Sequence, residues 1–401
     1  MISEKDLPGF FADKKDLKAE DYVHLMYRFE TEIDPKVAAA NLCCEQSTAQ
    51  WARPGRVEDF RPKHGAKVVA LTPDPSPEGG EGKAYRVTIA HPHRNFGPRI
   101  PNFLSAAAGE GPFYCPGIHF IKWTDFEFPE SFLNQFEGPQ FGLQGLRDMT
   151  GVTGRPFFVG VVKPNIGLTP KDFSEIAYQG LKGGLDIAKD DEMLADADWS
   201  PLKERARLAG EARKRAEEET GEKKIFISNV TDEVDALWRL HDDAVEGGAN
   251  TVMINAIMTG ISGLRALRRI AKVPVMSHFT GTAVFSRIPN FGISSLVAAK
   301  LQRLAGGDII GLAGFGDRMG CTDEEVLANI DACLKPWGPI KSALPIPGGS
   351  DTPETLPRVY GKIGHADFGF ICGRGVFGHP QGPAAGAKAL RDAWGRLRSP
   401  Q

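Results

Sequence analysis

The 401-residue sequence has few cysteines, no long apolar run and no strong charge of either sign. No run approaches the roughly 18 apolar residues of a membrane-spanning helix, and residues 1–7 lack the apolar core of a signal peptide. The six cysteines have no metal-site spacing, which favours reduced thiols in a cytoplasmic protein. Because the net charge is only −3, without a long basic run, neither nucleic acid nor membrane is expected as a partner.

The first part of the chain has a composition different from that of the rest. Alternating apolar residues predict strands, and an Ala-rich segment that begins with an Asp-Pro cap predicts a helix. A segment rich in Pro and Gly, residues 73–82, predicts an exposed loop. The strands are expected at 22–31, 66–71 and 84–90, and the helix at 34–42. We therefore predict an α+β domain of the ferredoxin-like type over residues 1–145.

Beyond residue 145 the pattern becomes a regular alternation of short apolar runs and segments with helical spacing. The eight apolar runs are 157–163, 185–189, 224–229, 251–255, 273–278, 308–312, 340–345 and 368–372. Such runs are typical of a parallel sheet that helices cover on both faces. Eight units favour a closed (β/α)8 TIM barrel over residues 146–401 rather than an open sheet. No Gly-x-Gly-x-x-Gly follows the first run, which disfavours a dinucleotide-binding fold.

The most informative segment is Gly183–Glu192, which reads as a short buried strand ending in one lysine and three carboxylates. Side chains two residues apart on a strand share a face, so we expect Lys189 and Asp191 to point the same way. Carboxylate oxygens suit a hard divalent cation such as Mg²⁺. An ammonium group cannot bind a metal, but an amine that has reacted with CO2 becomes a carbamate, which is an anionic oxygen ligand.

Other polar residues close the predicted barrel strands, where the chemistry of such barrels is found. Lys163, Asn229 and His278 end the first, third and fifth strands. Glycine-rich turns at 347–350 and 373–375 follow the last two strands and fit a phosphate cradle, because glycine lets backbone N–H groups approach an oxyanion. Arg374 adds a forked donor for phosphate or carboxylate.

Each of these features also has a plainer structural interpretation. Three adjacent acids often form a solvated turn or start a helix, and a lysine at a strand end often serves an ion pair. His278 alone would more often be a hydrogen-bonded core residue. The occurrence of all these features at one rim of the barrel favours a functional site.

These residues resemble the RuBisCO large-chain family. Gly183–Glu192 is similar to the family's reactive segment, Gly-Gly-Leu-Asp-Phe-Thr-Lys-Asp-Asp-Glu. Three further segments are similar to its first barrel strand, its N-terminal substrate-contact segment and its last phosphate loop: 160–168, 45–51 and 373–380. The resemblance implies that Lys189 is carbamylated and binds Mg²⁺ together with Asp191 and Glu192. It also implies that Lys163 moves protons at the enolisable carbon of the substrate, for which its pKa must fall below the usual range.

The resemblance implies further site residues and an oligomer. Glu45 and His278 match catalytic residues of the family, and family members are dimers or dimer-based oligomers in which the N-terminal domain closes over the neighbouring barrel. Glu45, Trp51 and Glu110 would then serve a site in another chain. Residues implied to contact the substrate or its phosphate are Trp51, Glu110, Gly348, Gly349, Gly373, Arg374 and Gly375.

Several positions depart from the pattern of the carboxylases. Asn165 replaces a second lysine, Phe279 replaces an arginine that grips one phosphate, and Ser294 replaces a histidine that helps that grip. The loop 314–318 lacks the lysine that stabilises incoming CO2, and Arg318 is its basic residue. Further replacements are Glu110 for an asparagine, Gln50 for a phosphate-binding threonine, Pro347 for a serine and Arg374 for a glycine.

This pattern is similar to the RuBisCO-like proteins of form IV, and most to the branch of photosynthetic bacteria, which is linked to sulfur metabolism and stress. Other form IV branches are enolases or isomerases of phosphorylated methylthio-sugars. The resemblance implies Mg²⁺-dependent enolisation or isomerisation of a small phosphorylated, sugar-like and sulfur-containing metabolite, without CO2 fixation. Two alternatives stay open, namely a non-catalytic ligand-binding or regulatory protein and, less favoured, a true ribulose-bisphosphate carboxylase.

The departures also predict the charge of the substrate. Each charge-assisted phosphate contact contributes about 1.5–3 kcal/mol, so the loss of arginine and histidine leaves a second phosphate poorly held. We therefore expect one phosphate or other anionic group, and an apolar or uncharged far end that packs against Phe279.

Overall fold

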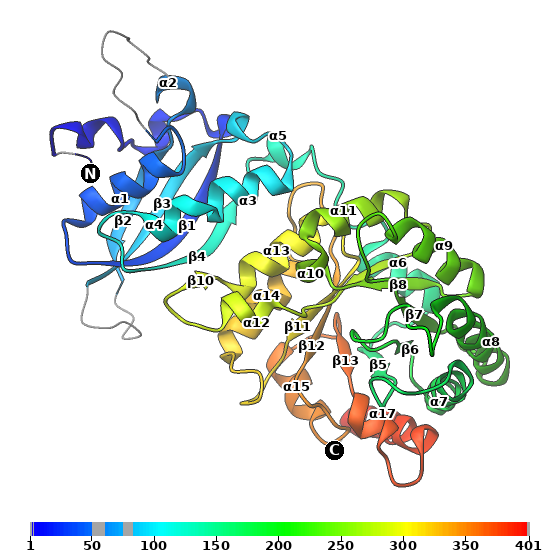
Figure 1. Ribbon diagram of the computed structural model, residues 1–401. Helices are drawn as coiled ribbons and strands as arrows, with labels where there is room; N and C mark the ends of the chain where they lie inside the picture. The colour runs from blue at the N-terminus through cyan, green and yellow to red at the C-terminus, as the bar shows by residue number, and fades with distance from the viewer. Residues whose placement is uncertain (1, 3, 50–60, 75–82, 399–401) are drawn as a thin grey trace. The chain divides into compact units, whose positions relative to one another are not determined.

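The computed structural model describes residues 2, 4–49, 61–74 and 83–398 (Figure 1). The chain forms two compact units. Unit 1 comprises Met1–Phe136 and Thr282–Ala298, and unit 2 comprises Glu137–Gly281 and Ala299–Gln401. Unit 1 therefore takes in a segment from the part of the sequence that carries the barrel pattern.

Unit 1 is built on a mixed sheet with the strand order β10-β4-β1-β3-β2. The pairs β1–β3, β1–β4 and β2–β3 are antiparallel, and the succession β-α-β-β-α-β gives the ferredoxin-like arrangement that the sequence predicts. The strands are β1 (Tyr22–Thr31), β2 (Lys67–Pro73), β3 (Lys83–Pro92), β4 (Phe120–Glu127) and β10 (Gly292–Ile293). The α-helices include α1 (Pro35–Glu45), α2 (Arg61–His64), α3 (Ile100–Ala108), α4 (Glu110–Tyr114), α5 (Glu130–Leu133) and α12 (Thr282–Ser286), and α13 (Ser295–Ala305) runs on into unit 2.

The predicted helix after the first strand is confirmed and is longer than expected. Asp34 caps α1 by accepting a hydrogen bond from the Lys36 backbone N–H at 2.7 Å, and Pro35 occupies the first helical position. The helix continues to Glu45, because buried alanine and cysteine side chains line its last turns. Most of the predicted loop at 73–82 lies outside the described residues.

Unit 2 is a near-closed barrel of eight parallel strands, which confirms the predicted fold class. The strand order is β12-β11-β9-β8-β7-β6-β5-β13. The two end strands pack together, because a Cβ on Gly369 would lie 2.8 Å from Cγ1 of Ile346. The strands are β5 (Phe157–Val161), β6 (Ile187–Lys189), β7 (Ile225–Asn229), β8 (Thr251–Ile254), β9 (Val275–Ser277), β11 (Ile309–Ala313), β12 (Leu344–Gly348) and β13 (Gly369–Ile371).

Helices alternate with these strands and surround them (Figure 1). They are α6 (Gly142–Thr150), α7 (Pro170–Gly183), α8 (Leu202–Thr220), α9 (Leu237–Gly247), α10 (Ala256–Thr259), α11 (Ile261–Ile270), α14 (Asp323–Leu334), α15 (Leu356–Ile363), α16 (Gly373–Phe377) and α17 (Pro383–Arg398). Close packing and backbone conformation explain why two glycines precede β6. A Cβ on Gly183 would lie 2.4 Å from the Ala384 carbonyl oxygen, and Gly184 ends α7 with a φ of +128°.

The seventh barrel strand lies four residues later than the sequence pattern indicates. Arg303 donates hydrogen bonds to the carbonyl oxygens of Ile340 and Lys341, at 3.0 and 2.9 Å. The Ile340 N–H donates to Trp337 O and closes a turn. Because these backbone groups are already hydrogen-bonded, they cannot pair with a neighbouring strand, and β12 begins only at Leu344.

The barrel interior is filled by apolar side chains that recur at every second strand position. Leu143 and Leu146 of α6 pack against this interior as well. The strand members of the core are Phe157, Val159, Ile187, Ile225, Ile227, Met253, Met276, Ile309, Leu344 and Ile346. Continuing the same alternation by two residues places Lys189, Asn229 and His278 on the interior side at the carboxyl ends.

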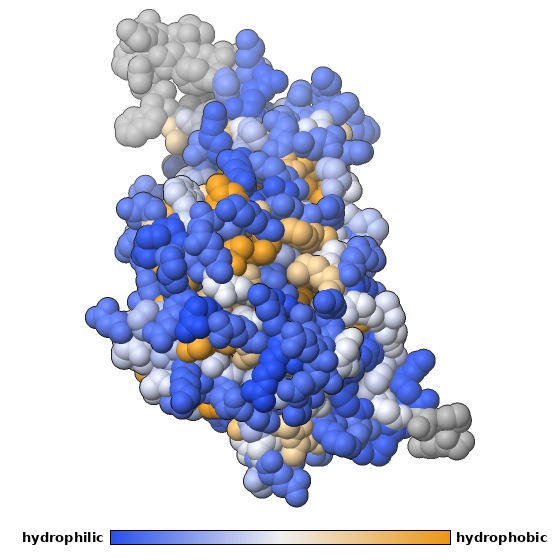
Figure 2. All heavy atoms as spheres, turned by 90° about the vertical axis from the view of Figure 1, so that its right-hand side faces the viewer, coloured by the Kyte–Doolittle hydropathy of each residue, from blue (hydrophilic) through white to orange (hydrophobic). Residues whose placement is uncertain are grey.

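The surface is largely hydrophilic on the face shown in Figure 2, where apolar side chains form small groups among polar ones. Within the described part of the chain, no helix is long and apolar enough to cross a membrane. The six cysteines form no disulfide in the described part of the chain, and five of them are buried.

Candidate functional site

The carboxyl ends of the barrel strands are aligned by the parallel ladder. Lys189, the last residue of β6, pairs with Val161 of β5 and with Ile227 of β7. Asn229, the last residue of β7, pairs with Met253 of β8. Polar side chains that end neighbouring strands are thus brought to one rim of unit 2.

Lys163 follows β5 and contacts the acidic segment after β6. Its Nζ lies 2.7 Å from Oδ2 of Asp191 and donates a second hydrogen bond, also of 2.7 Å, to Oδ1 of Asn165. About a quarter of the Lys163 side chain, 28%, is exposed, whereas Asp191 is fully buried. Asn165 therefore orients the lysine amine in this chain.

Lys189 is fully buried, and its Nζ donates to the Asp190 carbonyl oxygen at 2.6 Å. Burial lowers the pKa of this amine from its usual 10.5 to about 8, although the nearby carboxylates of Glu192, Asp191 and Asp190 favour the charged form. A neutral amine is the form that reacts with CO2. The environment of Lys189 is thus suited to carbamate formation.

Two asparagine side chains hold the backbone that carries the acidic residues. Asn229 Nδ2 donates to the carbonyl oxygens of Asp191 and Glu192, each at 3.2 Å, and Asn255 Nδ2 donates to that of Glu192 at 2.9 Å. Thr231 donates to Asn229 Oδ1 at 2.6 Å and fixes the orientation of this amide. The carboxylate of Glu192 is left 30% exposed at the rim.

His278 follows β9 and faces Glu192, with 3.7 Å between Nε2 and Oε2. Its Nδ1 lies 2.6 Å from the Thr280 hydroxyl, and its ring stacks on Phe279 with centroids 4.8 Å apart. Burial, and then the charges of Lys189 and Lys163, hold the pKa of His278 well below its usual range. The imidazole is therefore neutral at neutral pH.

The donor set at this rim fits a hard cation only when Lys189 is modified. Within the described residues, no group of three His, Cys, Asp or Glu side chains is arranged to hold a metal ion. Asp191 and Glu192 offer two carboxylates, and a carbamate on Lys189 would add a third anionic ligand of the oxygen type that Mg²⁺ prefers.

Two glycines in the turns after β12 and β13 leave no room for a side chain. A Cβ on Gly349 would lie 2.5 Å from the Phe315 carbonyl oxygen, and one on Gly375 would lie 2.7 Å from Cys372 Sγ. Gly348 is the last residue of β12. A Cβ on Gly373 would lie 3.8 Å from Cε of Lys163, so the last turn lies beside the lysine.

Two arginines accompany these turns. Arg318, in the loop after β11, donates to the Ser350 hydroxyl at 2.7 Å, and Arg374 is exposed in the first turn of α16. The Gly349 N–H donates to the buried carboxylate of Asp351 at 3.3 Å.

The remaining predicted residues belong to unit 1. Glu45 ends α1 and Glu110 begins α4, and both are exposed. These helix ends lie close together, because a Cβ on Gly111 would lie 3.4 Å from the carbonyl carbon of Glu45. Ser294 donates its hydroxyl to the Thr124 carbonyl oxygen at 2.8 Å, which gives it a structural role. Trp51 lies outside the described residues.

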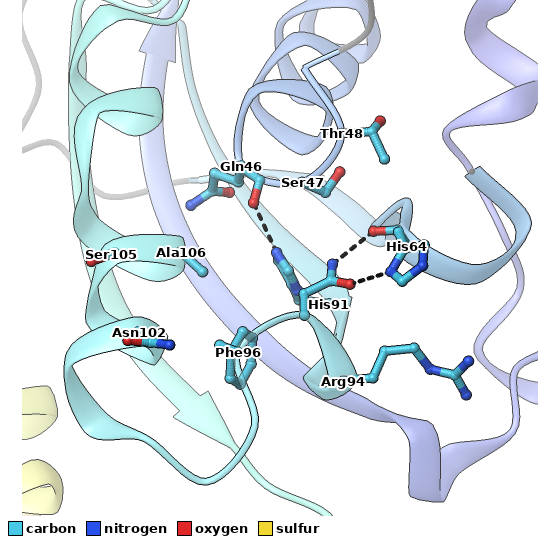
Figure 3. Close-up of a pocket in the computed structure, with 11 residues that line it drawn as sticks. Gln46, Ser47, Thr48, His64, His91, Arg94, Phe96, Asn102, Ser105 and Ala106 are labelled. Atoms are coloured by element: carbon cyan, nitrogen blue, oxygen red, sulfur yellow. Dashed lines mark hydrogen bonds between the residues drawn. The ribbon is translucent and has the colours of Figure 1, made fainter. Parts of the chain in front are cut away.

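A cavity of about 680 Å³ lies in unit 1 next to the end of α1 (Figure 3). His91 Nε2 lies 2.8 Å from the Gln46 carbonyl oxygen, and His64 and Asn95 hydrogen-bond each other. Gln46 Nε2 also donates to Ala107 O at 3.1 Å. The bonds of Gln46 connect the end of α1 to β3 and α3 and so support the segment that carries Glu45.

Comparisons with known proteins identify the chain. Residues 142–399 match the catalytic domain of the ribulose bisphosphate carboxylase large chain, and residues 11–132 match its N-terminal domain. The chain belongs to the RuBisCO large-chain family. The resemblance found in the sequence is thereby confirmed.

Within this family, the chain is similar to RuBisCO-like proteins of photosynthetic bacteria. It is 55% identical to ribulose bisphosphate carboxylase-like protein 2 of Rhodopseudomonas palustris, over 98% of this chain and 93% of that protein. It is 53% identical to the ribulose bisphosphate carboxylase-like protein of Chlorobaculum tepidum, with the same coverage. The crystal structure of the octameric RuBisCO of Pyrococcus horikoshii in complex with sulfate superposes with a TM-score of 0.89 at 32% identity, covering 96% and 90% of the two chains.

Several residues that shape the candidate site are not predicted from the sequence. Asn255 lies two residues after Met253, so the alternation of β8 carries the signal that points it inward. Thr280 gives no such signal, because it lies in a loop. Arg205 of α8 also has none, because its contact with Asp190 joins residues 15 positions apart.

Proposed function

We propose that the protein catalyses a Mg²⁺-dependent enolisation or isomerisation of a small phosphorylated, sugar-like metabolite and does not fix CO2. The observation that carries this proposal is the placement of Lys163, with its Nζ 2.7 Å from Asp191. A proton-transferring amine then lies beside the carboxylates offered to a cation. The similarity to RuBisCO-like proteins supports the absence of carboxylation.

The first chemical event in this proposal is the modification of Lys189. The lone pair of the neutral Nζ attacks the carbon of CO2, a C–N bond forms, one C=O π bond opens onto oxygen, and one amine proton leaves to solvent. The product is a carbamate with one negative charge. Its neighbours Asp191 and Glu192 would then complete a ligand set for Mg²⁺.

The residues of the chain move and hold the proton. When bound, Mg²⁺ would polarise a carbonyl or hydroxyl oxygen of the substrate and lower the free energy of an enediolate. Lys163 Nζ would exchange the proton at the adjacent carbon, while Asn165 keeps the amine oriented. The neutral imidazole of His278 would hydrogen-bond to a substrate hydroxyl.

The opposite end of the site supports a substrate with one anionic group. Phe279 packs over Gly311, because a Cβ there would lie 3.3 Å from Phe279 Cδ1, and it presents an aromatic ring where carboxylases use an arginine. An apolar or thioether end would pack on such a ring. The turn at 373–375 with Arg374, and Arg318 nearby, would hold one phosphate, and the Gly349 N–H would join them by exchanging its bond to Asp351. Nanomolar binding of a bisphosphate with both phosphates held would contradict this assignment.

The proposal predicts solvent exchange without carboxylation. Phosphorylated sugars, including methylthio derivatives, would be incubated with the protein, Mg²⁺ and bicarbonate in D2O, and deuterium at carbon would be followed by NMR. Exchange is expected with at least one compound, and no labelled CO2 should enter ribulose 1,5-bisphosphate. Labelled product would contradict the proposal, and tight ligand binding without exchange would favour a regulatory protein.

We further propose that the protein works as a homodimer or a dimer-based oligomer, in which Glu45, Trp51 and Glu110 serve the neighbouring chain. Exposed apolar side chains on α4, on α12 and between α12 and β10 support an interface: Phe113, Tyr114, Val284, Ile288 and Phe291. The octameric assembly of the Pyrococcus horikoshii protein supports self-association in the family. A monomer in sedimentation at micromolar protein would contradict it.

A further inference from the structure

The side chain of Asp190 points to the opposite side of the strand from the side chains of its two neighbours. Lys189 and Asp191 lie at the interior rim, whereas Asp190 faces the helix layer and meets Arg205 of α8. The Asp190 and Arg205 side chains are both fully buried. Arg205 Nε and Nη2 donate to Oδ1 and Oδ2 of Asp190, each at 3.2 Å, in a two-pronged contact.

The remaining hydrogen-bonding capacity of this pair is directed at the backbone around the metal ligands. Asp190 Oδ2 accepts from the Asn229 N–H at 2.8 Å and from the Ser228 hydroxyl at 3.2 Å. Arg205 donates to the carbonyl oxygens of Ala195 and Ser200, each at 2.6 Å. One buried pair thus ties the loop that follows the acidic residues to α8 and to the end of β7.

The connection to Asn229 extends the influence of the pair to the metal ligands themselves. The Asn229 backbone is held by Asp190, and its side chain holds the carbonyl oxygens of Asp191 and Glu192. A buried ion pair contributes little net stability, because desolvation of the two charges offsets their attraction. The contacts of the Asp190–Arg205 pair instead restrict the position of two carboxylates. This role differs from a general contribution to the stability of the fold.

We infer that the buried Asp190–Arg205 pair is the positioning element of the metal site and holds Asp191 and Glu192 where a divalent cation can bind both. The inference rests on the proposed function, because it requires the cation. Residues that orient metal ligands typically affect metal affinity by about 10- to 100-fold. Arg205 and Asp190 would exert this effect without touching the ion.

The test compares Arg205→Lys with a matched control, Arg303→Lys. Lysine keeps the charge but cannot supply the forked donors. Arg303 is also buried, at 1% exposure, and its hydrogen bonds go to backbone carbonyls at the end of α14 and in the turn before β12, so its replacement removes comparable bonds away from the metal ligands. Mn²⁺ binding to the full-length protein is measured by electron paramagnetic resonance with bicarbonate present, and Tm is recorded for each variant.

We expect both variants to lose several degrees of Tm, and only Arg205→Lys to raise the Kd for Mn²⁺, by about 10- to 100-fold. Equal Mn²⁺ affinity in Arg205→Lys and the unsubstituted protein would overturn this inference but leave the proposed metal site standing. Absence of bicarbonate-dependent Mn²⁺ binding in the unsubstituted protein would overturn the metal site as well. If Arg205→Lys does not fold, Asp190→Asn replaces it with the same two outcomes.

Discussion

Replacement of Lys189 by methionine is expected to abolish the bicarbonate-dependent binding of Mn²⁺. Methionine keeps the length and the buried apolar stem of the side chain but has no amine to form a carbamate. Two carboxylates, Asp191 and Glu192, would remain, with water in the other positions of a cation that prefers about six oxygen donors, so the part of the affinity that depends on bicarbonate would be lost. Isothermal titration with Mn²⁺, with and without bicarbonate, measures the effect, and NMR with ¹³C-labelled bicarbonate detects the carbamate directly.

Lys224→Met is the matched control for this experiment. Lys224 is also buried, at 1% exposure, and burial also lowers its pKa, but it precedes β7 at the opposite end of the barrel and bonds to Glu222. This variant should keep both the carbamate signal and Mn²⁺ binding. A carbamate signal of unchanged intensity in Lys189→Met would show that another lysine is modified, and the ligand set would have to be reassigned.

Replacement of Lys163 by methionine is expected to abolish carbon–deuterium exchange in the substrate found by screening. General acid–base groups contribute about 10²–10⁴-fold to rate, and Lys163 is placed to move the proton. Exchange is followed by NMR in D2O, as for the unsubstituted protein. Because Lys163 is not a proposed ligand, Mn²⁺ binding should persist in this variant, which distinguishes it from Lys189→Met.

A surface lysine provides the comparison for Lys163→Met. Lys203 on α8 has a side chain that is 66% exposed and pairs with Asp243, so Lys203→Met should leave exchange unchanged. Exchange at the normal rate in Lys163→Met would remove this residue from the mechanism and leave His278 as the next group to test.

Much of the barrel could be predicted from the sequence, because its strands are apolar runs of regular spacing. The rim could be predicted for the same reason, since Lys189 and His278 end such runs. The start of β12 could not, because Arg303, distant in sequence, takes the carbonyl groups of Ile340 and Lys341. A local sequence pattern cannot indicate a hydrogen-bond donor that belongs to a distant helix.

The roles within the acidic segment were also only partly predictable. Strand alternation places Lys189 and Asp191 on one face, but it does not say what Asp190 meets on the other. That answer depends on α8, which brings Arg205 to the outside of the strand. Likewise, the addition of β10 to the sheet of unit 1 has no sequence signal, because the strand is only Gly292–Ile293.

Asp190 lies between Lys189 and Asp191, and its side chain points to the opposite side of the strand from theirs. This arrangement makes the site sensitive to the length of the chain. Loss or gain of one residue between Leu185 and Lys189 would turn the reactive amine toward α8 and a carboxylate toward the interior. Substitutions at Asn165 or Phe279 leave this division intact. The chemistry at the rim can therefore diversify by replacement of single side chains, whereas insertions and deletions in β6 would destroy the site altogether.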